Sequence, residues 1–591
     1  MVEAAISDAT RDSSDDIRES IEIWSAFRVH KWSYDPSNRH FFYVGDKFKL
    51  HSDAGARVGM LEERLNWLCG VYSRNPYFRT PLPGVNRDSI QLNRVDELPA
   101  IIAAVSKGRS SKEIHLVGML TQPEEGVWCI EDGTRSVSLL LEPGIKLSRG
   151  YFTETCVVHG TGVYDPEAVV GASLRLMGSS WVDPDRQSLH PAPPHSTSST
   201  PSTSISLSNR AITEGRLPGA FRVKALSHPP VESRASTLLH MCEVDTFRKL
   251  GTPGDFERVL QSELSPTSST SMFMILSDLH MDDPSVQTNL VKVMTGFASY
   301  GQIPSLCVLM GNFTSRPHST AGAVGPLFTA AMRTLADILV GFPSFKASQF
   351  LLIPGPGDPG SAGGVLPRPP LPTALAEPLL KLQNSGWRIA LRSNPTRLRF
   401  FTQELVFFRG EVSQRLARGS MLPPQAGSDS HAPLASTTGS HVTFTLLRQC
   451  HLLPLSSRSQ PIYWELDHTL RLSPAPHAIF VGEDARYWAQ EEVVSGSGGG
   501  GRTIVACPGS FCGDETFCVY RPTLGKVELC DVNGDDEEEE GGEAMEPEFC
   551  SQDQPSMSQQ LGQLGELGLG GSPPHKDGKM GDGQGEEENI E

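Results

Sequence analysis

The sequence predicts a layered α/β domain in the second half of the chain, preceded by a small β-barrel. Three observations lead to this fold class. Apolar runs of four or five residues recur after residue 270 and end in polar or glycine-rich loops. Amphipathic helical stretches lie between several of these runs, which is typical of layered α/β domains. Between residues 113 and 177, short strand-like runs alternate with turn residues instead, as in small barrels.

The composition predicts a soluble intracellular protein. The N-terminal residues are polar and acidic, unlike a signal peptide, and no stretch of about eighteen apolar residues predicts a transmembrane helix. The eleven cysteines are scattered without a C-x-x-C pair, which argues against a zinc ribbon or a redox motif. Such a set indicates reduced thiols in the cytosol or the nucleus.

The net charge of −18 is concentrated at the C-terminus, because residues 531–591 alone contribute −16. We therefore predict a disordered acidic tail over 532–591. The rest of the chain is nearly neutral and offers no charge argument for tight autonomous binding of nucleic acid.

A connecting region is predicted ahead of the barrel. Residues 1–20 are predicted to be disordered. Aromatic and β-branched residues at 21–43 surround the turn at 35–38, which predicts a hairpin, and helices are expected at 59–72 and 95–106. The connecting region is thus assigned to 21–110.

Five short strands at 114–120, 127–131, 136–141, 155–162 and 173–177 predict a closed barrel of the OB type over residues 112–183. Many OB folds stack the bases of single-stranded nucleic acid on aromatic side chains above a basic groove. The candidate stacking residues are Trp128, Tyr151, Phe152 and Tyr164. The same loops are crowded by Glu124, Glu125, Glu131 and Asp132. A barrel that docks a protein is therefore favoured over one that reads nucleic acid.

A flexible linker rich in Ser, Thr and Pro is predicted at 184–210, followed by the large domain at 211–531. Two low-complexity segments inside that domain, 425–440 and 495–501, are expected to be exposed loops.

The large domain is organised around residues 272–284. The apolar run 272–276 predicts a buried strand that leads into Asp278-Leu279-His280. Asp283 is then placed as a helix N-cap before Pro284, and an amphipathic helix is expected at 284–299. A carboxylate and an imidazole on one loop are a common beginning of a metal site, although a turn aspartate beside a capping residue is the commoner explanation.

The same order of strand and loop recurs downstream. The runs 306–310, 350–353, 478–481 and 503–506 lead into Gly311-Asn312, 354–359, Gly482-Glu483-Asp484 and 508–511. A second helix is expected at 326–341. We expect these loops to gather at one sheet edge.

This order of motifs resembles that of the calcineurin-like metallophosphoesterases. The resemblance implies two metal ions and a metal-activated hydroxide that attacks a phosphoester. Asp278 and His280 stand at ligand positions, but Asn312 replaces the carboxylate that bridges the two metals. Losing that negative charge removes what holds two cations close together.

Other ligand positions are altered too. Pro356 and Gly357 occupy the places of the Asn-His pair, before Asp358, and Gly482-Glu483-Asp484 contains no histidine. His451 aligns loosely with the lone histidine of the family. The resemblance therefore implies no catalytic, cofactor-binding or metal-binding residues, and no cofactor. The vestigial positions are Asp278, His280, Asn312, Asp358 and His451.

Longer strings resemble the B subunits of the eukaryotic replicative DNA polymerases, those of polymerase epsilon in particular. These strings lie at 118–122, 307–315, 350–371, 393–404 and 461–464, and the likeness extends over about 21–522. Family members usually begin with a helical domain that contacts the replicative helicase. This chain starts near the segment that follows such a domain.

The resemblance implies a non-catalytic accessory subunit in the nucleus. It would bind the cysteine-rich C-terminal region of the catalytic subunit of DNA polymerase epsilon, where the polymerase chemistry resides. Other small polymerase subunits, the replicative helicase and DNA held by the complex are further implied partners, and no membrane is implied. The alternatives are an active metal-dependent phosphodiesterase or nuclease, and an independent single-strand-binding protein.

Overall fold

The structure of the chain is a computed structural model. It describes residues 21–35, 38, 40–45, 48–78, 89–105, 113–168, 215–241, 253–265, 270–317, 324–360, 364–424, 434–494 and 501–533. The predicted disorder at 1–20, the linker at 184–210 and almost all of the acidic tail therefore lie outside the described residues. The described residues all belong to one unit defined by their contacts, Met1–Gly534.

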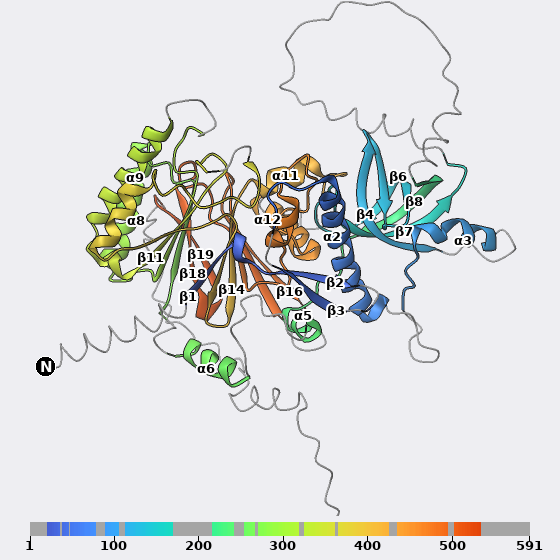
Figure 1. Ribbon diagram of the computed structural model, residues 1–591, viewed down its shortest axis with the longest axis horizontal. Helices are drawn as coiled ribbons and strands as arrows, with labels where there is room; N and C mark the ends of the chain where they lie inside the picture. The colour runs from blue at the N-terminus through green and yellow to red at the C-terminus, as the bar shows by residue number, and fades with distance from the viewer. Residues whose placement is uncertain are drawn as a thin grey trace, which may run out of the picture. The chain divides into compact units, whose positions relative to one another are not determined.

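Two six-stranded sheets form the large domain (Figure 1). The first sheet has the order β1 (Ile21–Ser25), β13 (Thr396–Phe400), β14 (Gln403–Arg409), β15 (Ala478–Gly482), β17 (Gly501–Cys507) and β16 (Trp488–Val494). The second has the order β12 (Arg388–Leu391), β11 (Gln349–Ile353), β10 (Leu306–Met310), β9 (Phe273–Ser277), β18 (Thr516–Arg521) and β19 (Lys526–Asp531). In each sheet the central strands are parallel, whereas β13, β16, β18 and β19 pair in antiparallel fashion.

The two sheets pack face to face, and alternate residues of each strand point to different cores. On β10, Leu306, Val308 and Met310 belong to the core shared by the sheets. Cys307 and Leu309 of the same strand face the helices on the other side. The predicted layered α/β architecture is thus confirmed, but periodicity alone did not show that the strands divide between two sheets.

Helices cover the outer face of each sheet (Figure 1). The second sheet is covered by α8 (Pro284–Ser299), α9 (Val324–Val340) and α10 (Glu377–Leu380). The first is covered by α11 (Val412–Gly419) and α12 (Leu434–Gln449). The helix predicted at 284–299 has these same bounds, and the Asp283 side chain accepts a hydrogen bond from the Ser285 amide as its N-cap. The loop predicted at 425–440 is wrong in its second half, because α12 begins at Leu434.

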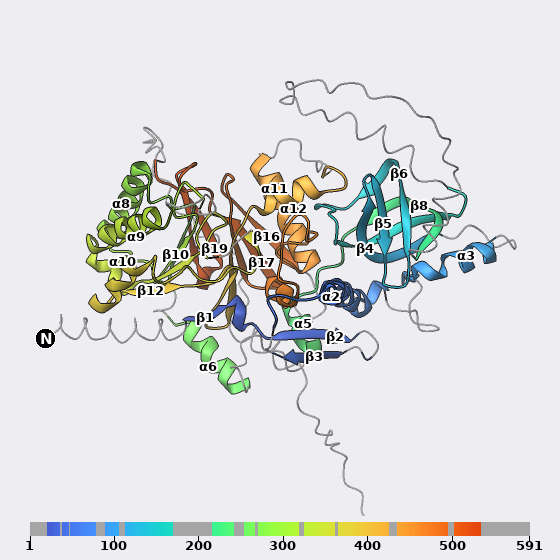
Figure 2. The same cartoon turned by 45° about the horizontal axis from the view of Figure 1, so that its top comes forward.

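The barrel, seen in Figure 2, closes with five strands. Their order is β4 (Ile114–Glu124), β5 (Val127–Glu131), β6 (Ser136–Leu147), β8 (Arg216–Ser227) and β7 (Val157–Asp165). The predicted closed five-stranded barrel is confirmed, but β8 lies beyond residue 211, in the range predicted for the large domain. The predicted strand at 173–177 lies outside the described residues. The predicted boundaries at 183 and 211 therefore need correction. The barrel extends to Ser227, because β8 returns to it after a long connection that local spacing cannot reveal.

The N-terminal segment contacts both the large domain and the barrel. The antiparallel pairing of β2 (Lys31–Asp35) with β3 (His40–Gly45) confirms the predicted hairpin, but β1 instead joins the large domain by pairing with β13. Helix α2 (Ala54–Arg74) packs on the outside of the barrel, where Leu65 and Leu68 share a core with Val117 and Met119. The predicted connecting region thus packs against both the large domain and the barrel.

The remaining helices are short. They are α3 (Leu98–Val105), α5 (Arg234–Met241), α6 (Pro253–Glu263), η1 (Ala26–Arg28), η2 (Pro76–Phe78), η3 (Val95–Glu97), η6 (Pro343–Ala347), η8 (Lys381–Ser385), η9 (Trp464–Leu470) and η10 (Pro522–Leu524). None of the helices in the described ranges combines the length and the apolarity needed to cross a membrane.

Candidate functional site at the strand ends

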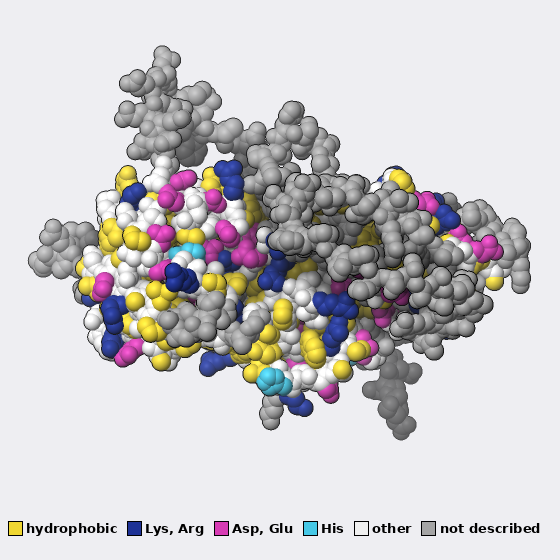
Figure 3. Space-filling model, turned by 90° about the horizontal axis from the view of Figure 1, so that it is seen from above, with side chains coloured by type: hydrophobic (Ala, Val, Ile, Leu, Met, Phe, Trp, Pro, Cys, Tyr) yellow, Lys and Arg dark blue, Asp and Glu magenta, His cyan; other side chains and the backbone are white. Residues whose placement is uncertain are grey.

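The carboxyl ends of the parallel strands meet at one edge of the two sheets. The strand registers place Ser277 of β9 beside Met310 of β10, and Arg409 of β14 beside Gly482 of β15. The loops that follow these strands therefore lie together, as the sequence predicted. In Figure 3, which views the molecule from above, Asp and Glu side chains gather around a histidine on the large domain.

Asp278 and Asn312 contact each other at this edge. Asp278 is buried, and its backbone φ of 58° lies in the left-handed region that aspartate tolerates. Its Oδ1 accepts hydrogen bonds from the Asn312 amide at 3.1 Å and from Asn312 Nδ2 at 3.3 Å. The loops after β9 and β10 are thus joined directly through these two predicted positions.

Arg409 provides the positive charge at the centre of the site. Its buried guanidinium donates to Asp278 Oδ1 at 2.6 Å and to Glu411 Oε1 at 2.6 Å. It also donates to the carbonyl oxygens of Gly311 at 2.7 Å and Gly482 at 3.1 Å. Burial lowers the pKa of Arg409, but the two carboxylates outweigh it and hold this pKa above its ordinary value. One side chain therefore links the ends of β9, β10, β14 and β15.

Asp358 joins its own loop, after β11, to the loop after β10, but it does not contact Arg409 by a hydrogen bond. Its carboxylate accepts from the Phe313 amide at 2.9 Å and from the Gly355 amide at 2.7 Å. A Cβ at Gly311 would lie 1.8 Å from Asp358 Oδ2, so this close approach requires glycine. Burial raises the pKa of Asp358 to about 6 despite these amides.

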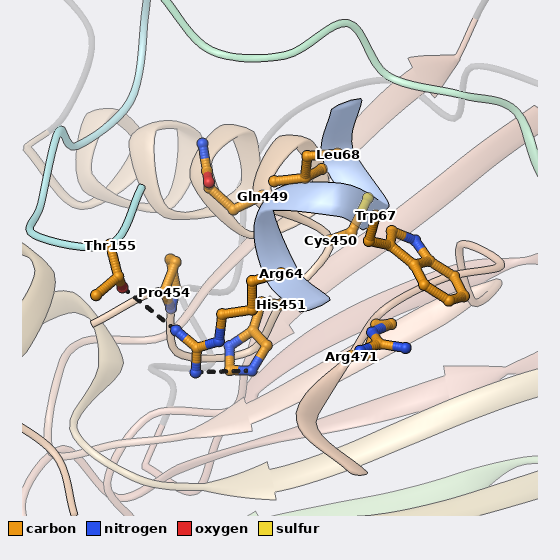
Figure 4. Close-up of a pocket in the computed structure, with 9 residues that line it drawn as sticks. All are labelled: Arg64, Trp67, Leu68, Thr155, Gln449, Cys450, His451, Pro454 and Arg471. Atoms are coloured by element: carbon orange, nitrogen blue, oxygen red, sulfur yellow. Dashed lines mark hydrogen bonds between the residues drawn. The ribbon is translucent and has the colours of Figure 1, made fainter. Parts of the chain in front are cut away.

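The two predicted histidines lie apart from each other. His280 is half-buried on the Asp278 loop, where its amide donates to the Asp278 carbonyl. His451 belongs to a different cluster: its Nε2 lies 3.2 Å from Arg64 Nη2 (Figure 4) and 3.3 Å from Asp467 Oδ1. The structure thus brings Asp278, Asn312 and Asp358 together, with His280 on the first loop, and places His451 elsewhere.

The residues at the strand ends do not fit a two-metal centre. Among the described residues, no group of three or more His, Cys, Asp or Glu side chains is arranged to hold a metal ion. The Arg409 guanidinium already binds the Asp278 carboxylate, which would have to be a ligand. A divalent cation about 4 Å from that guanidinium would meet a repulsion of several kcal/mol even at an effective dielectric constant of about 20.

Glu483 is the most unusual carboxylate of this edge. Its Oε2 accepts from the Ser413 amide at 2.8 Å and from Ser413 Oγ at 2.9 Å, whereas its buried Oε1 has no partner among the described residues. Burial raises the pKa of Glu483 to about 7. Its ionisation therefore costs stability in the folded protein.

We expect Glu483→Gln to stabilise the chain by about 1–3 kcal/mol at pH 8 and by much less at pH 5. A carboxyl group whose folded pKa is raised stabilises the fold below its unfolded pKa of about 4.5, and this contribution is lost as the pH rises through about 7. The amide cannot ionise, so the variant avoids that loss. Denaturant unfolding at both pH values measures the difference, and equal effects at pH 5 and pH 8 would contradict the assignment.

Sequence reasoning missed Arg409 and Glu411. A signal for them was present, because the apolar run 405–408 ends in Arg-Gly-Glu just as the other runs end in polar loops. Metal-ligand motifs are defined by histidines and carboxylates, so an arginine such as Arg409 does not stand out among them.

Comparison with known proteins identifies the family of this chain. Residues 273–490 match the family model of the B subunit of DNA polymerases alpha and epsilon, and residues 54–230 match that of the DNA polymerase epsilon subunit 2-like OB-fold domain. The DNA polymerase epsilon B subunit of Arabidopsis thaliana is 30% identical over 511 residues, which cover 86% of this chain and 82% of the relative. The chain belongs to the family of DNA polymerase epsilon B subunits.

Other relatives in this family are more distant. DNA polymerase epsilon subunit 2 of Bos taurus is 24% identical, and the match covers 82% of this chain and 79% of the relative. The B subunit from Schizosaccharomyces pombe is also 24% identical, and the match covers 79% of this chain and 71% of the relative. The match of the OB-fold model extends to residue 230, which includes β8 and agrees with the corrected barrel boundary.

The crystal structure of TT1561 from Thermus thermophilus aligns with 44% of this chain and 99% of its own at 13% identity. Its TM-score is 0.23, so the fold assignment rests on the sheets and the barrel themselves.

Proposed function

We propose that this chain is a non-catalytic scaffold subunit of DNA polymerase epsilon that acts in nuclear DNA replication. The observation that supports it most directly is the buried Arg409 guanidinium, 2.6 Å from Asp278, at the edge where a phosphoesterase would need metal ions. The guanidinium of Arg409 thus neutralises the negative charge of Asp278. The relatives are named as polymerase epsilon subunits, which supports a role for such a scaffold in a replicative polymerase.

The large domain is, in this proposal, a calcineurin-like phosphoesterase fold that has lost its chemistry. Asp278 and His280 keep the positions of the first motif, Asn312 takes the bridging position, and Asp358 binds backbone amides. His451 takes part in a structural cluster with Arg64 and Asp467. These five positions are vestigial.

The partner would be the cysteine-rich C-terminal region of the catalytic subunit, with other small subunits and the replicative helicase nearby and DNA held by the complex. A scaffold needs surfaces fixed in relation to one another, and buried contacts between the barrel and the large domain support this. Tyr151 donates its amide to Thr445 Oγ1 at 2.8 Å. Gln449 exchanges hydrogen bonds with both backbone groups of Val157, at 2.9 and 2.8 Å. The two modules can therefore present one continuous docking surface.

The test is an affinity purification of the tagged full chain from its own cells. We expect a large polymerase catalytic chain to co-elute at close to one-to-one stoichiometry. A matched variant, Asp278→Ala with His280→Ala, is compared for hydrolysis of a generic phosphodiester with manganese, and neither protein should show activity. A chain that elutes alone and loses a manganese-dependent activity in the double variant would contradict the proposal and favour the phosphodiesterase alternative.

A further inference from the structure

A groove lies between helix α8 and the edge strand β19 of the second sheet. Its volume is about 310 Å³. Val293 and Phe297 of α8 line one side, and Phe517 of β18 and Val532, directly after β19, line the other. These four side chains also pack in the core between this sheet and its helices. The groove therefore opens that apolar core to the surface, beside the helix that Figure 1 shows on the outer side of the sheet.

The same surface carries an exposed aromatic side chain. Tyr300, the C-cap of α8, also lines the groove. It is 84% exposed, more than any other large hydrophobic residue of the described ranges. A single exposed tyrosine is ordinary, but this one stands beside an apolar hollow. The surface thus combines a projecting aromatic group with a groove lined by apolar side chains.

Opposite charges flank the groove. Lys292 lines it from α8, and Asp531 lines it from β19. The Lys292 Nζ donates to Asn533 Oδ1 at 2.9 Å, and Asp531 Oδ1 accepts from the Asn533 amide at 2.9 Å. Within the described ranges, neither charge has a partner of the opposite sign. A positive charge on one rim and a negative charge on the other are therefore both available to a second molecule.

Gly296 lies inside α8 and lines the groove as well. A Cβ at this position would meet no heavy atom within 4 Å. The packing of the described residues therefore does not require a glycine here, although glycine is less stable than alanine inside a helix. A glycine does allow another backbone to approach closely, and the side chains at the contact set the distance between two packed helices. Gly296 thus suits a helix that crosses α8 at this point.

A surface that has a hollow and a projection, and a cation and an anion, is complementary to itself across a two-fold axis. We propose that this α8 groove joins two copies of the chain, with their α8 helices crossing at Gly296. Tyr300 of each copy would enter the groove of the other, and Lys292 would meet Asp531 of the partner subunit. A helix of another protein would need only the hollow, whereas a second copy uses every one of these features.

The association is expected to be weak. One groove on each copy offers a small contact area, and interfaces that bury less than about 1,200 Å² are mostly transient. Each chain also carries a net charge of −18, so two chains repel each other at low salt. At about 0.15 M salt, where this repulsion is largely screened, we expect a Kd on the order of 10 μM.

The test is sedimentation velocity of the full chain at this salt concentration, between about 1 and about 100 μM, which brackets the expected Kd. The wild-type chain should shift from monomer towards dimer. Lys292→Glu and Asp531→Lys each place like charges opposite one another in both symmetric contacts, so each variant should dimerise at least about tenfold more weakly. An equal mixture of these two variants should associate like the wild-type chain, because a mixed dimer has opposite charges at both contacts.

Two further variants separate dimerisation from folding and from net charge. Gly296→Leu should be at least as stable as the wild-type chain, because its Cβ meets open space and leucine favours a helix, but it should not dimerise. Lys346→Glu makes the same charge change at an exposed position of η6 that does not line the groove, and it should dimerise like the wild-type chain.

Three results would overturn the proposal. A wild-type chain that stays monomeric at about 100 μM, well above the expected Kd, would leave a helix of another protein as the occupant of the groove. A mixture of the two charge variants that associates no better than either alone would exclude the symmetric pairing. Dimerisation of Gly296→Leu at the wild-type level would place the contact elsewhere. The isolated chain is used throughout, so the outcome does not depend on the proposed role as a polymerase scaffold.

Discussion

Replacing Arg409 with methionine is expected to lower the free energy of unfolding by about 3–5 kcal/mol. The variant keeps much of the volume but leaves the buried Asp278 carboxylate without its cation, which lies 2.6 Å away in the wild-type chain. The carbonyl oxygens of Gly311 and Gly482 lose a donor as well. Each of these unpaired buried groups carries a desolvation penalty. Chemical denaturation of the full chain measures the loss.

Two further variants make this result interpretable. Arg409→Lys keeps the charge but not the planar fork, and we expect an intermediate loss because a lysine cannot reach all four partners. Arg333→Met removes an exposed arginine from α9 and should change stability by less than about 0.5 kcal/mol. A loss of under about 1 kcal/mol for Arg409→Met would show that the guanidinium does not hold the strand ends together.

Replacing Asp467 with asparagine should cost a similar amount, about 3–5 kcal/mol, at a second buried cluster. Asp467 lies on η9 and accepts from Arg64 Nε at 3.0 Å and from Arg64 Nη2 at 2.5 Å. Arg64 comes from α2, and it also donates to Thr155 Oγ1 of the barrel (Figure 4). The asparagine removes the counter-charge from a buried arginine, so the junction of α2, the barrel and the large domain is weakened.

A double-mutant cycle with Arg64→Met tests whether the cost comes from the broken pair. Removing both charges should cost much less than the sum of the single variants, because neither partner is then left unpaired. Burial alone raises the pKa of Asp467, but Arg64 and His451 hold it well below its ordinary value. The pair therefore stabilises the fold above about pH 4, and its contribution is lost as the pH falls further. Additive costs, or a pH-independent effect of Asp467→Asn, would contradict this account.

Individual elements of this protein were predictable because they depend on short-range patterns. The helix at 284–299 begins with an aspartate cap and proline, and the strand at 306–310 is an unbroken apolar run, so both bounds agree with the structure. The loop positions Asp278, Asn312 and Asp358 also lie together, because parallel strands present their carboxyl ends at one edge. The longer sequence strings, such as 350–371, further indicated the family of polymerase B subunits.

Contacts between distant segments were not predictable in this way. His451 follows α12 and has the right order for a ligand, yet it packs against Arg64, nearly four hundred residues away in sequence. Arg409 was overlooked because a lone arginine in a sequence gives no sign of whether it faces solvent or a buried carboxylate.

The sequence by itself determined the layered α/β class of the large domain, the presence of a closed barrel, the Asp283 cap of α8 and the family. Only the tertiary structure decided that β8 completes the barrel, that β1 joins β13, and that Arg409 neutralises the strand ends. The physical reason is how far apart in sequence the interacting groups lie. Backbone preferences and apolar periodicity act over a few residues, whereas strand pairing and the burial of a charge depend on groups that only the folded chain brings together.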